Sequence, residues 1–285
     1  MAAQNYQLPT QDVSWLTRDQ LLFAVSIGIG VDELNFVFEQ NGIFEAFPTY
    51  PTILPFKLTD QEIVDFGARF QPPTIPGAPT FRSVNIVDGG RTITFYRPIP
   101  SSSANQQFQL KNRILGVYDR GVLVASSKTR RSSSMPRPGK SPLLPSYPPP
   151  KDKAPDAQHM YEVPTNAALI YRLNGDYNRL HVTREPGKSL GFGGPVMHGL
   201  YTYNCAAHAV LKEVGASRPA NLRELSARFS SPVRLGDVLV TKIWKLGTFQ
   251  DEYEEIRFVT YVKGKAVLTN GRALVRPSSS PHGKF

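Results

Sequence analysis

The chain of 285 residues is 40% hydrophobic and carries a formal net charge of +10, which fits one large or two ordinary globular domains with buried cores. Its longest strongly apolar stretch, residues 21–31, is shorter than the roughly 20 residues that cross a bilayer, and the amino terminus lacks the features of a signal peptide. We therefore expect neither a membrane span nor a secretion signal, and the single cysteine, Cys205, excludes an internal disulfide and favours a small core residue.

Two short helices are expected near the amino terminus. Residues 17–20, Thr-Arg-Asp-Gln, have the form of a capping box, so a helix is expected to begin at Thr17. Gly28 and Gly30 interrupt it, and residues 33–39 form a second short helix. The two glycines are no dinucleotide-binding fingerprint, because no strand precedes them and a third glycine is missing.

A few strands follow these helices. Residues 91–97 alternate apolar and polar side chains as a half-buried strand does, and residues 108–118 look like the partner of that strand. A turn at residues 119–121 leads into a third strand from about residue 122. A sheet that wraps a helix needs at least one more strand, and none is visible. The amino-terminal half is therefore abbreviated, or it completes its sheet by unusual pairing.

Most of the positive charge lies in one segment between Lys128 and Lys153. Seven Lys and Arg accompany a single acid, Asp152, in this segment, which is also rich in proline. Such a composition is typical of a solvated linker, and the segment lacks the interleaved aromatic residues of a surface that binds single strands. We expect no nucleic-acid partner, and the modest charge elsewhere suits a small anionic ligand.

The carboxy-terminal half predicts helices followed by a run of strands. Thr165 is expected to cap a short helix that ends at Gly175, and apolar residues recur at helical spacing from His198 to Gly215. Strands are expected at residues 225–233, 238–246, 253–262 and 266–275, with a hairpin turn at residues 263–265. A long helix with small residues, followed by antiparallel strands, predicts an α+β fold. The tail from residue 277 is polar.

A carboxylate, an amide and an imidazole share one short turn after Gly175. Asp176, Asn178 and His181 stand at positions i, i+2 and i+5. Asp and His together can hold a water between an acceptor and a group that exchanges a proton near neutral pH, as the addition or removal of water requires. The alternative is that Asp176 and Asn178 only form the turn, and the spacing alone favours that interpretation.

The sequence around this turn resembles the MaoC-like hydratases, the hydratase 2 family. Residues 171–181 and 194–200, and then 227–233 with the following Gly-Asp pair, resemble three family blocks in the same order. In the amino-terminal half, three further blocks are similar to the non-catalytic half of the eukaryotic two-domain members; these are residues 21–28, 47–51 and 96–100.

The resemblance implies a double hot-dog fold, in which each of two repeats wraps an antiparallel sheet around a long helix. It divides the chain into a non-catalytic half at residues 1–127, a basic linker at 128–158, a catalytic MaoC-like domain at 159–276 and a polar tail at 277–285.

The resemblance also implies a reaction, the addition of water to a trans-2-enoyl thioester to give the (R)-3-hydroxyacyl product, or its reverse. Asp176 and His181 are the implied acid/base pair, Asn178 orients them or contacts the thioester, and the amide of Gly199 stabilises the thioester oxygen. Candidate substrate contacts are Tyr177, Arg179 and His198. His198 is slightly better explained as a polar residue of the first helical turn, and Arg179 is equally explained as a solvent-exposed side chain. No spacing typical of metal ligands occurs, so no metal and no cofactor are expected.

Two departures from the family pattern point to a specialised substrate. Arg179 replaces the usual proline, and Thr183 stands where an acidic residue is common. The expected function is that of a fungal-type dehydratase acting on a polyketide or a modified fatty acyl chain, or of a hydratase in peroxisomal beta-oxidation. The substrate would be carried by coenzyme A or a carrier protein. The alternatives are an inactive acyl-CoA-binding or scaffold protein and a thioesterase. We expect a homodimer. The last three residues only faintly resemble a peroxisomal targeting signal, so the expected location is the peroxisome or the cytosol.

Overall fold

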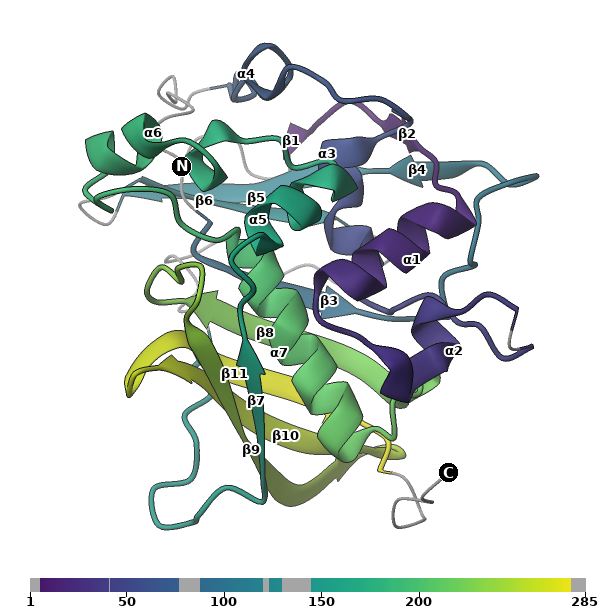
Figure 1. The fold of residues 1–285 in the computed structure, drawn as a ribbon, viewed down its shortest axis with the longest axis vertical. Coiled ribbons are helices and arrows are strands. Elements are labelled where there is room, and N and C mark those ends of the chain that lie inside the picture. Colours follow the sequence, from purple (N-terminus) through teal and green to yellow (C-terminus); the bar gives the residue numbers. More distant parts are fainter. Residues whose placement is uncertain (1–5, 41, 77–87, 120–122, 130–144, 278–285) are drawn as a thin grey trace.

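The longest helix, α7 (Gly199–Val214), packs into a curved antiparallel sheet of six strands (Figure 1). The computed structural model describes residues 6–40, 42–76, 88–119, 123–129 and 145–277. The strands of this sheet, in spatial order, are β3 (Gly90–Thr94), β8 (Leu222–Phe229), β11 (Lys265–Val275), β10 (Tyr253–Val262), β9 (Val238–Gln250) and β7 (Ala157–Glu162). The predicted long helix and the four strands after it are confirmed, although β8 begins and ends several residues earlier than expected.

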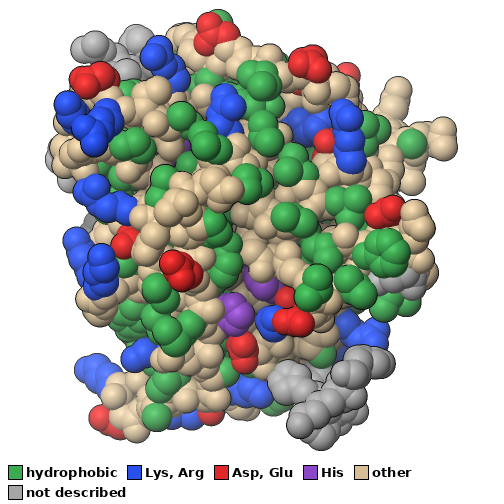
Figure 2. All heavy atoms as spheres, viewed as in Figure 1, with side chains coloured by type: hydrophobic (Ala, Val, Ile, Leu, Met, Phe, Trp, Pro, Cys, Tyr) green, Lys and Arg blue, Asp and Glu red, His purple; other side chains and the backbone are tan. Residues whose placement is uncertain are grey.

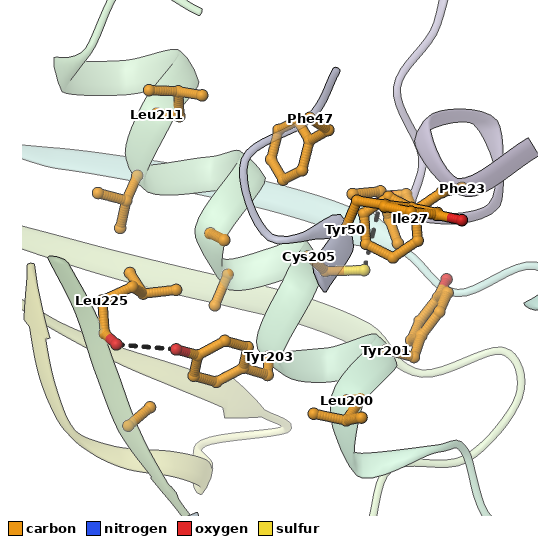
Figure 3. Close-up of a cluster of buried hydrophobic side chains, with 14 of the residues drawn as sticks. Phe23, Ile27, Phe47, Tyr50, Leu200, Tyr201, Tyr203, Cys205, Leu211 and Leu225 are labelled. Carbon is orange, nitrogen blue, oxygen red and sulfur yellow. Dashed lines mark hydrogen bonds between the residues drawn. The ribbon is translucent and has the colours of Figure 1, made fainter. Parts of the chain in front are cut away.

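Small side chains allow α7 to lie close to the sheet. Ala206, Ala207 and Ala209 are buried, and so is Cys205, whose thiol donates to the carbonyl of Ile27 (Figure 3). The hydroxyl of Tyr203 donates to the carbonyl of Leu225 on β8 at 2.8 Å. The core role predicted for the single cysteine is therefore confirmed.

The amino-terminal half forms a helical layer with two small sheets beside α7. Its helices are α1 (Thr17–Ser26), α2 (Leu34–Val37), α3 (Leu54–Lys57) and α4 (Phe66–Arg69), with 3-10 turns η1 (Val31–Glu33) and η2 (Tyr50–Thr52). In the part of the chain that the structure describes, its other strands pair as β1-β5-β6 and β2-β4. These strands are β1 (Tyr6–Gln7), β2 (Gln11–Val13), β4 (Phe108–Leu110), β5 (Asn112–Asp119) and β6 (Leu123–Thr129).

The expected pairing of residues 91–97 with residues 108–118 is wrong. Strand β3 pairs with β8 instead, with Ile93 opposite the buried Leu225, so the amino-terminal half adds an edge strand to the sheet of the other half. The alternating pattern of β3 shows only that it needs an apolar surface on one side, and β8 supplies that surface. Of the two alternatives drawn from the sequence, unusual pairing is the one observed.

The start of α1 also differs from the expected capping box. Leu16 is the residue that flanks the helix, and its N–H donates to the carboxylate of Asp19 at 2.8 Å. Gln20, which was expected to reach back, is buried and 1% exposed. The side chain that accepts a hydrogen bond from the start of the helix is therefore Asp19, one residue earlier than the predicted Gln20. Gln20 is buried instead.

The remaining elements lead into and out of α7. They are α5 (Ala167–Tyr171), η4 (Arg172–Asn174), η5 (Arg179–His181), α6 (Arg184–Ser189) and η6 (Pro219–Asn221). Asn166, not Thr165, flanks α5. The hairpin turn is confirmed, with Lys263 and Gly264 at φ angles of 50° and 79°. Residues 130–144 of the predicted basic linker, the turn at residue 120 and the tail from residue 278 lie outside the described residues.

The two halves share one hydrophobic core. Phe23 of α1 lies edge-on to Tyr50 with ring centroids 5.4 Å apart, and it lies 6.5 Å from Tyr171 of α5. Figure 3 shows Phe23, Tyr50 and Cys205 of α7 in this shared cluster. The amino-terminal half is therefore an integral part of the fold. Among the described residues, no helix is long and apolar enough to cross a membrane.

Candidate active site

A left-handed glycine delivers the predicted motif to the interior. Gly175 has a φ angle of 122° and closes η4, and a Cβ atom at this position would lie 2.9 Å from Cα of Lys57. Asn174, the residue before it, is held by bonds from its Nδ2 to the carbonyl of Tyr171 and the hydroxyl of Ser26. Only glycine fits this close approach. The chain therefore turns sharply, and Asp176 faces inward.

Asp176, His181 and His198 converge in the interior. They are 9%, 8% and 1% exposed, and one polar atom from each lies within 4.8 Å of the others. The carboxyl group and the imidazole that the motif pointed to thus face each other, and a second imidazole from the start of α7 joins them.

His181 is held as a neutral base. Its Nδ1 lies 2.8 Å from the carbonyl of Val196, and because a carbonyl only accepts, Nδ1 carries the proton and Nε2 keeps its lone pair. Burial lowers the pKa of His181 to about 4, although the hydrogen bond to Val196 opposes this shift. The ring is therefore uncharged near pH 7 and can accept a proton through Nε2.

Asp176 is a carboxylate of weakened acidity. Burial raises its pKa to about 6, while the N–H of Asn178, 3.3 Å from Oδ1, and the charge of Arg91 lower it. Asp176 is mainly ionised at pH 7 and still lies close enough to neutrality to exchange a proton. Together with His181 it offers two acceptors to a single water molecule.

His198 lies behind this pair and not at the surface. Its ring stacks on that of His181 with centroids 3.6 Å apart and planes inclined by 25°. Its Nε2 donates to the main-chain carbonyl of Asp176 at 3.1 Å. The contact with an exposed coenzyme that was one expectation for His198 is not supported by this position.

The start of α7 faces the same place. His198 flanks the helix and Gly199 is its first residue, exposed, with the ring of Phe229 3.4 Å from where a Cβ would stand. Unpaired N–H groups and the helix dipole favour negative charge at such an end. The amide that the resemblance implied for the thioester oxygen therefore follows directly after His198, whose ring stacks on that of His181.

The other candidates of the motif have different surroundings. The side chain of Asn178 accepts from the N–H of Leu180 at 3.0 Å and so shapes the turn. Tyr177 turns away, with the guanidinium of Arg172 5.0 Å from its ring centre, and lines a cavity of about 300 Å³. That cavity lies against α1 of the other half and includes Leu22 and Ile63.

The two departures from the family pattern occur together on the surface. Arg179 is exposed, and its main-chain carbonyl accepts from both the N–H and the hydroxyl of Thr183, at 2.9 and 3.1 Å. The threonine therefore closes the turn, and the guanidinium of Arg179 remains at the surface.

Asp176, His181 and His198 are also the group of described residues whose types suit a metal ion. Each imidazole already has one nitrogen on a main-chain carbonyl, which leaves one nitrogen of each ring and the Asp176 carboxylate for a bound molecule.

Sequence reasoning did not find Arg91. It lies on β3, opposite Ala227 of β8, and its charge acts on Asp176 from the other half of the chain. No local pattern marks this residue, because its position depends on the pairing of strands that are more than a hundred residues apart in the sequence.

Comparison with known proteins gives consistent results for both halves. A family model described as "MaoC like domain" matches residues 147–267, and one described as "MFE-2 hydratase 2 N-terminal domain" matches residues 14–135. The chain is 39% identical to "Probable dehydratase NIT22" of Ajellomyces capsulatus, over 92% of this chain and 79% of that protein. It is 28% identical to "Enoyl-CoA hydratase 2, peroxisomal" of Arabidopsis thaliana, over 85% of each. A solved MaoC-like dehydratase from Phytophthora capsici superimposes with a TM-score of 0.80 at 28% identity, over 98% of this chain and 97% of that one.

Proposed function

The chain belongs to the MaoC-like dehydratase family in its two-domain hydratase 2 form, and we propose that Asp176 and His181 carry its hydro-lyase reaction on enoyl thioesters. The observation that supports this assignment is the convergence of a buried carboxylate and a buried neutral imidazole beside the start of α7.

The geometry supports a simple path for the water. A water molecule donates to the Asp176 carboxylate and to Nε2 of His181, and its oxygen forms the new bond to C3 of the substrate. The pair accepts the proton that leaves the water and returns a proton to C2. Between these steps the electron pair of the double bond rests on the thioester oxygen, where the Gly199 amide stabilises it; losing such a donor costs about 3 kcal/mol in barrier. Dehydration follows the same path in reverse.

The test is hydration of crotonyl-CoA by the purified protein. We expect loss of the conjugated enoyl absorbance and a 3-hydroxy product of (R) configuration. Asp176→Asn and His181→Gln should each lower kcat by roughly 10² to 10⁴. The control variants Asp156→Asn and His159→Gln change the same side-chain types outside the site and should retain full activity. Failure to hydrate any enoyl thioester would favour the binding-protein alternative, and release of free thiol without hydration would favour the thioesterase.

We also propose that the substrate is specialised and anionic at one end, as a coenzyme A or carrier-protein thioester is. Lys and Arg side chains gather along the left edge of the face in Figure 2, over α6 and below it. Arg184 and Lys188 of α6 and the nearby Arg179 are exposed there and suit phosphate groups. The similarity to a protein named as a probable dehydratase supports the dehydration direction, and we propose a polyketide or modified fatty acyl chain as the acyl part of the substrate. A panel of enoyl thioesters that differ in length and oxygenation would identify the preferred chain.

Location and assembly belong to the same proposal. The similarity to a relative named as peroxisomal supports a peroxisomal or cytosolic site of action. Imaging of a fluorescent fusion with a free carboxy terminus would distinguish these two compartments. We propose a homodimer, and light scattering of the purified protein tests it.

A further inference from the structure

One extended segment, residues 196–198, contacts both reacting groups from behind. The carbonyl of Val196 accepts from His181 at 2.8 Å, and Nε2 of His198 donates to the main-chain carbonyl of Asp176 at 3.1 Å. Between them, the N–H of Met197 donates to the carbonyl of Val233 at 2.8 Å. The segment is therefore fixed to the loop between β8 and β9 and contacts both sides of the site.

The ring of His198 supports the ring of His181 over its whole face. The centroids are 3.6 Å apart, and the ring of Tyr171 also packs against His198 with its centre 5.0 Å away. Burial lowers the pKa of His198, so the ring is neutral and stacks without charge repulsion. Because its Nε2 donates to a carbonyl, Nδ1 is an unprotonated acceptor, and within the described chain this buried atom has no partner.

Asp176 depends on this support because its carboxylate is held loosely. The hydrogen bond from the N–H of Asn178 measures 3.3 Å, which is long for a bond of this type. The bond from His198 to the main-chain carbonyl therefore limits where the carboxylate can move.

We infer that His198 is a positioning residue for the water chemistry, which clamps Asp176 through Nε2 and His181 through its ring face. The inference rests on the proposed function. Misplacing a reacting group by about 1 Å can lower a rate roughly 100-fold. His198 acts through the two reacting residues and does not need to contact the substrate, so its loss should lower kcat and leave KM nearly unchanged.

Three substitutions of His198 distinguish the contributions of its Nε2 atom, its Nδ1 atom and its ring face. The amide of His198→Gln reaches the position of Nε2 and can still donate to Asp176, so kcat should remain within about tenfold of the wild type. The shorter amide of His198→Asn reaches only the position of Nδ1, and His198→Phe keeps the stacking face without a donor. These two variants should lose about 100-fold in kcat. His208→Gln, a change of a buried histidine on the same helix, is the control and should keep its kcat.

Several results would overturn the inference. One is the opposite order, with His198→Asn active and His198→Gln impaired, since Nδ1 would then be the working atom. A rise in KM at unchanged kcat would instead indicate direct contact with the substrate. Nitrogen NMR of the wild-type protein tests the idea even if variants unfold, because His198 must be neutral and protonated on Nε2. A wild type that fails to hydrate crotonyl-CoA counts against the proposed function, whereas an active wild type with a fully active His198→Phe counts against this inference alone.

Discussion

Asp176 and His181 differ in the pH at which each changes charge, and this difference predicts the pH profile of the enzyme. The pKa is about 6 for Asp176 and about 4 for His181. Because the reaction needs Asp176 as an acceptor, kcat/KM for hydration should be level above about pH 7 and fall as the pH drops through 6. His181 stays neutral over this range. The measurement is kcat/KM for crotonyl-CoA from pH 4.5 to 9, where the observed midpoint belongs to the pair.

The variants give this profile its control. Asp176→Asn should remove the fall near pH 6 together with most of the activity, while the residual rate of His181→Gln should still show the fall. A profile that breaks only near pH 4, or one that Asp176→Asn leaves in place, would assign the titration to another group.

Parts of the site that are close in sequence could be predicted, and parts that depend on distant contacts could not. Asp176 and His181 lie five residues apart on one turn, and the resemblance of the surrounding sequence to the family motif pointed to them, although the spacing alone favoured a turn-forming role. The role of His198 depends on the stacking of its ring on that of His181, which is 17 positions earlier in the sequence. The role of Arg91 depends on the pairing of strands from the two halves. A single sequence contains the residue types but not these contacts.

At the scale of elements, the turn between η4 and η5 depends on Gly175. A methyl group there would lie 2.9 Å from the backbone of Lys57, and the φ angle of 122° strains any other residue. Gly175→Ala should therefore destabilise the protein by about 2 to 4 kcal/mol and abolish most of the activity. Gly193→Ala is the matched control, because Gly193 also has a positive φ angle, 77°, but nothing lies within 4 Å of its Cβ position. Urea unfolding measures both; equal losses would contradict the packing argument.

Strand β3 carries a positive charge toward the site. Arg91 is directly opposite Ala227, a buried residue, so the two share the inner face of the sheet. Phe229 lies two residues further along that face, and its ring borders Gly199. His181 and His198 lie next to Asp176, and Tyr171 also interacts with its charge. Arg91 is the cation on the strand side, and its charge lowers the pKa of Asp176.

Arg91→Gln should consequently raise the pKa of Asp176 above its present value of about 6. The acid side of the kcat/KM profile should shift to higher pH, and Arg91→Lys should restore most of the original profile. Arg97→Gln, which removes an exposed cation from the same segment, should leave it in place. If Arg91→Gln and Arg97→Gln give the same pH profile of kcat/KM, then the charge of Arg91 has no effect on the pKa of Asp176.

Elements with a strong local pattern were predicted well, and pairings between them were not. The helical spacing of α7 and the alternation in β9 to β11 are local, and short turns between neighbouring strands leave little choice of partner. No short turn joins strand β3 to the strand with which it pairs. Its alternating side chains therefore predicted a strand correctly, but the predicted partner was wrong. Gln20 was misassigned for a related reason, because its burial in the shared core is decided by distant residues.

At the scale of the whole molecule, a buried carboxylate joins the two halves. Glu33 of the amino-terminal half is 5% exposed and lies 2.5 Å from Nε2 of His208 and 3.3 Å from Nζ of Lys212, both on α7. The hydroxyl of Ser217, just beyond the helix, also donates to it. Burial raises the pKa of Glu33, but the hydrogen bonds and the charges of these partners outweigh burial and lower it to about 2.

This network predicts a pH-dependent attachment of the two halves. Because the pKa of Glu33 falls from 4.5 to about 2 on folding, the carboxylate stabilises the fold above pH 4.5, and that contribution is lost as the pH falls toward 2. Glu33→Gln should cost about 3 kcal/mol of unfolding free energy at pH 7, since it removes the buried carboxylate that His208, Lys212 and Ser217 contact. The cost should shrink steadily when urea unfolding is repeated below pH 4.5. Glu39→Gln, an exposed change a few residues away, should cost almost nothing at any pH. A cost for Glu33→Gln that is independent of pH would mean that packing, and not charge, holds the halves together.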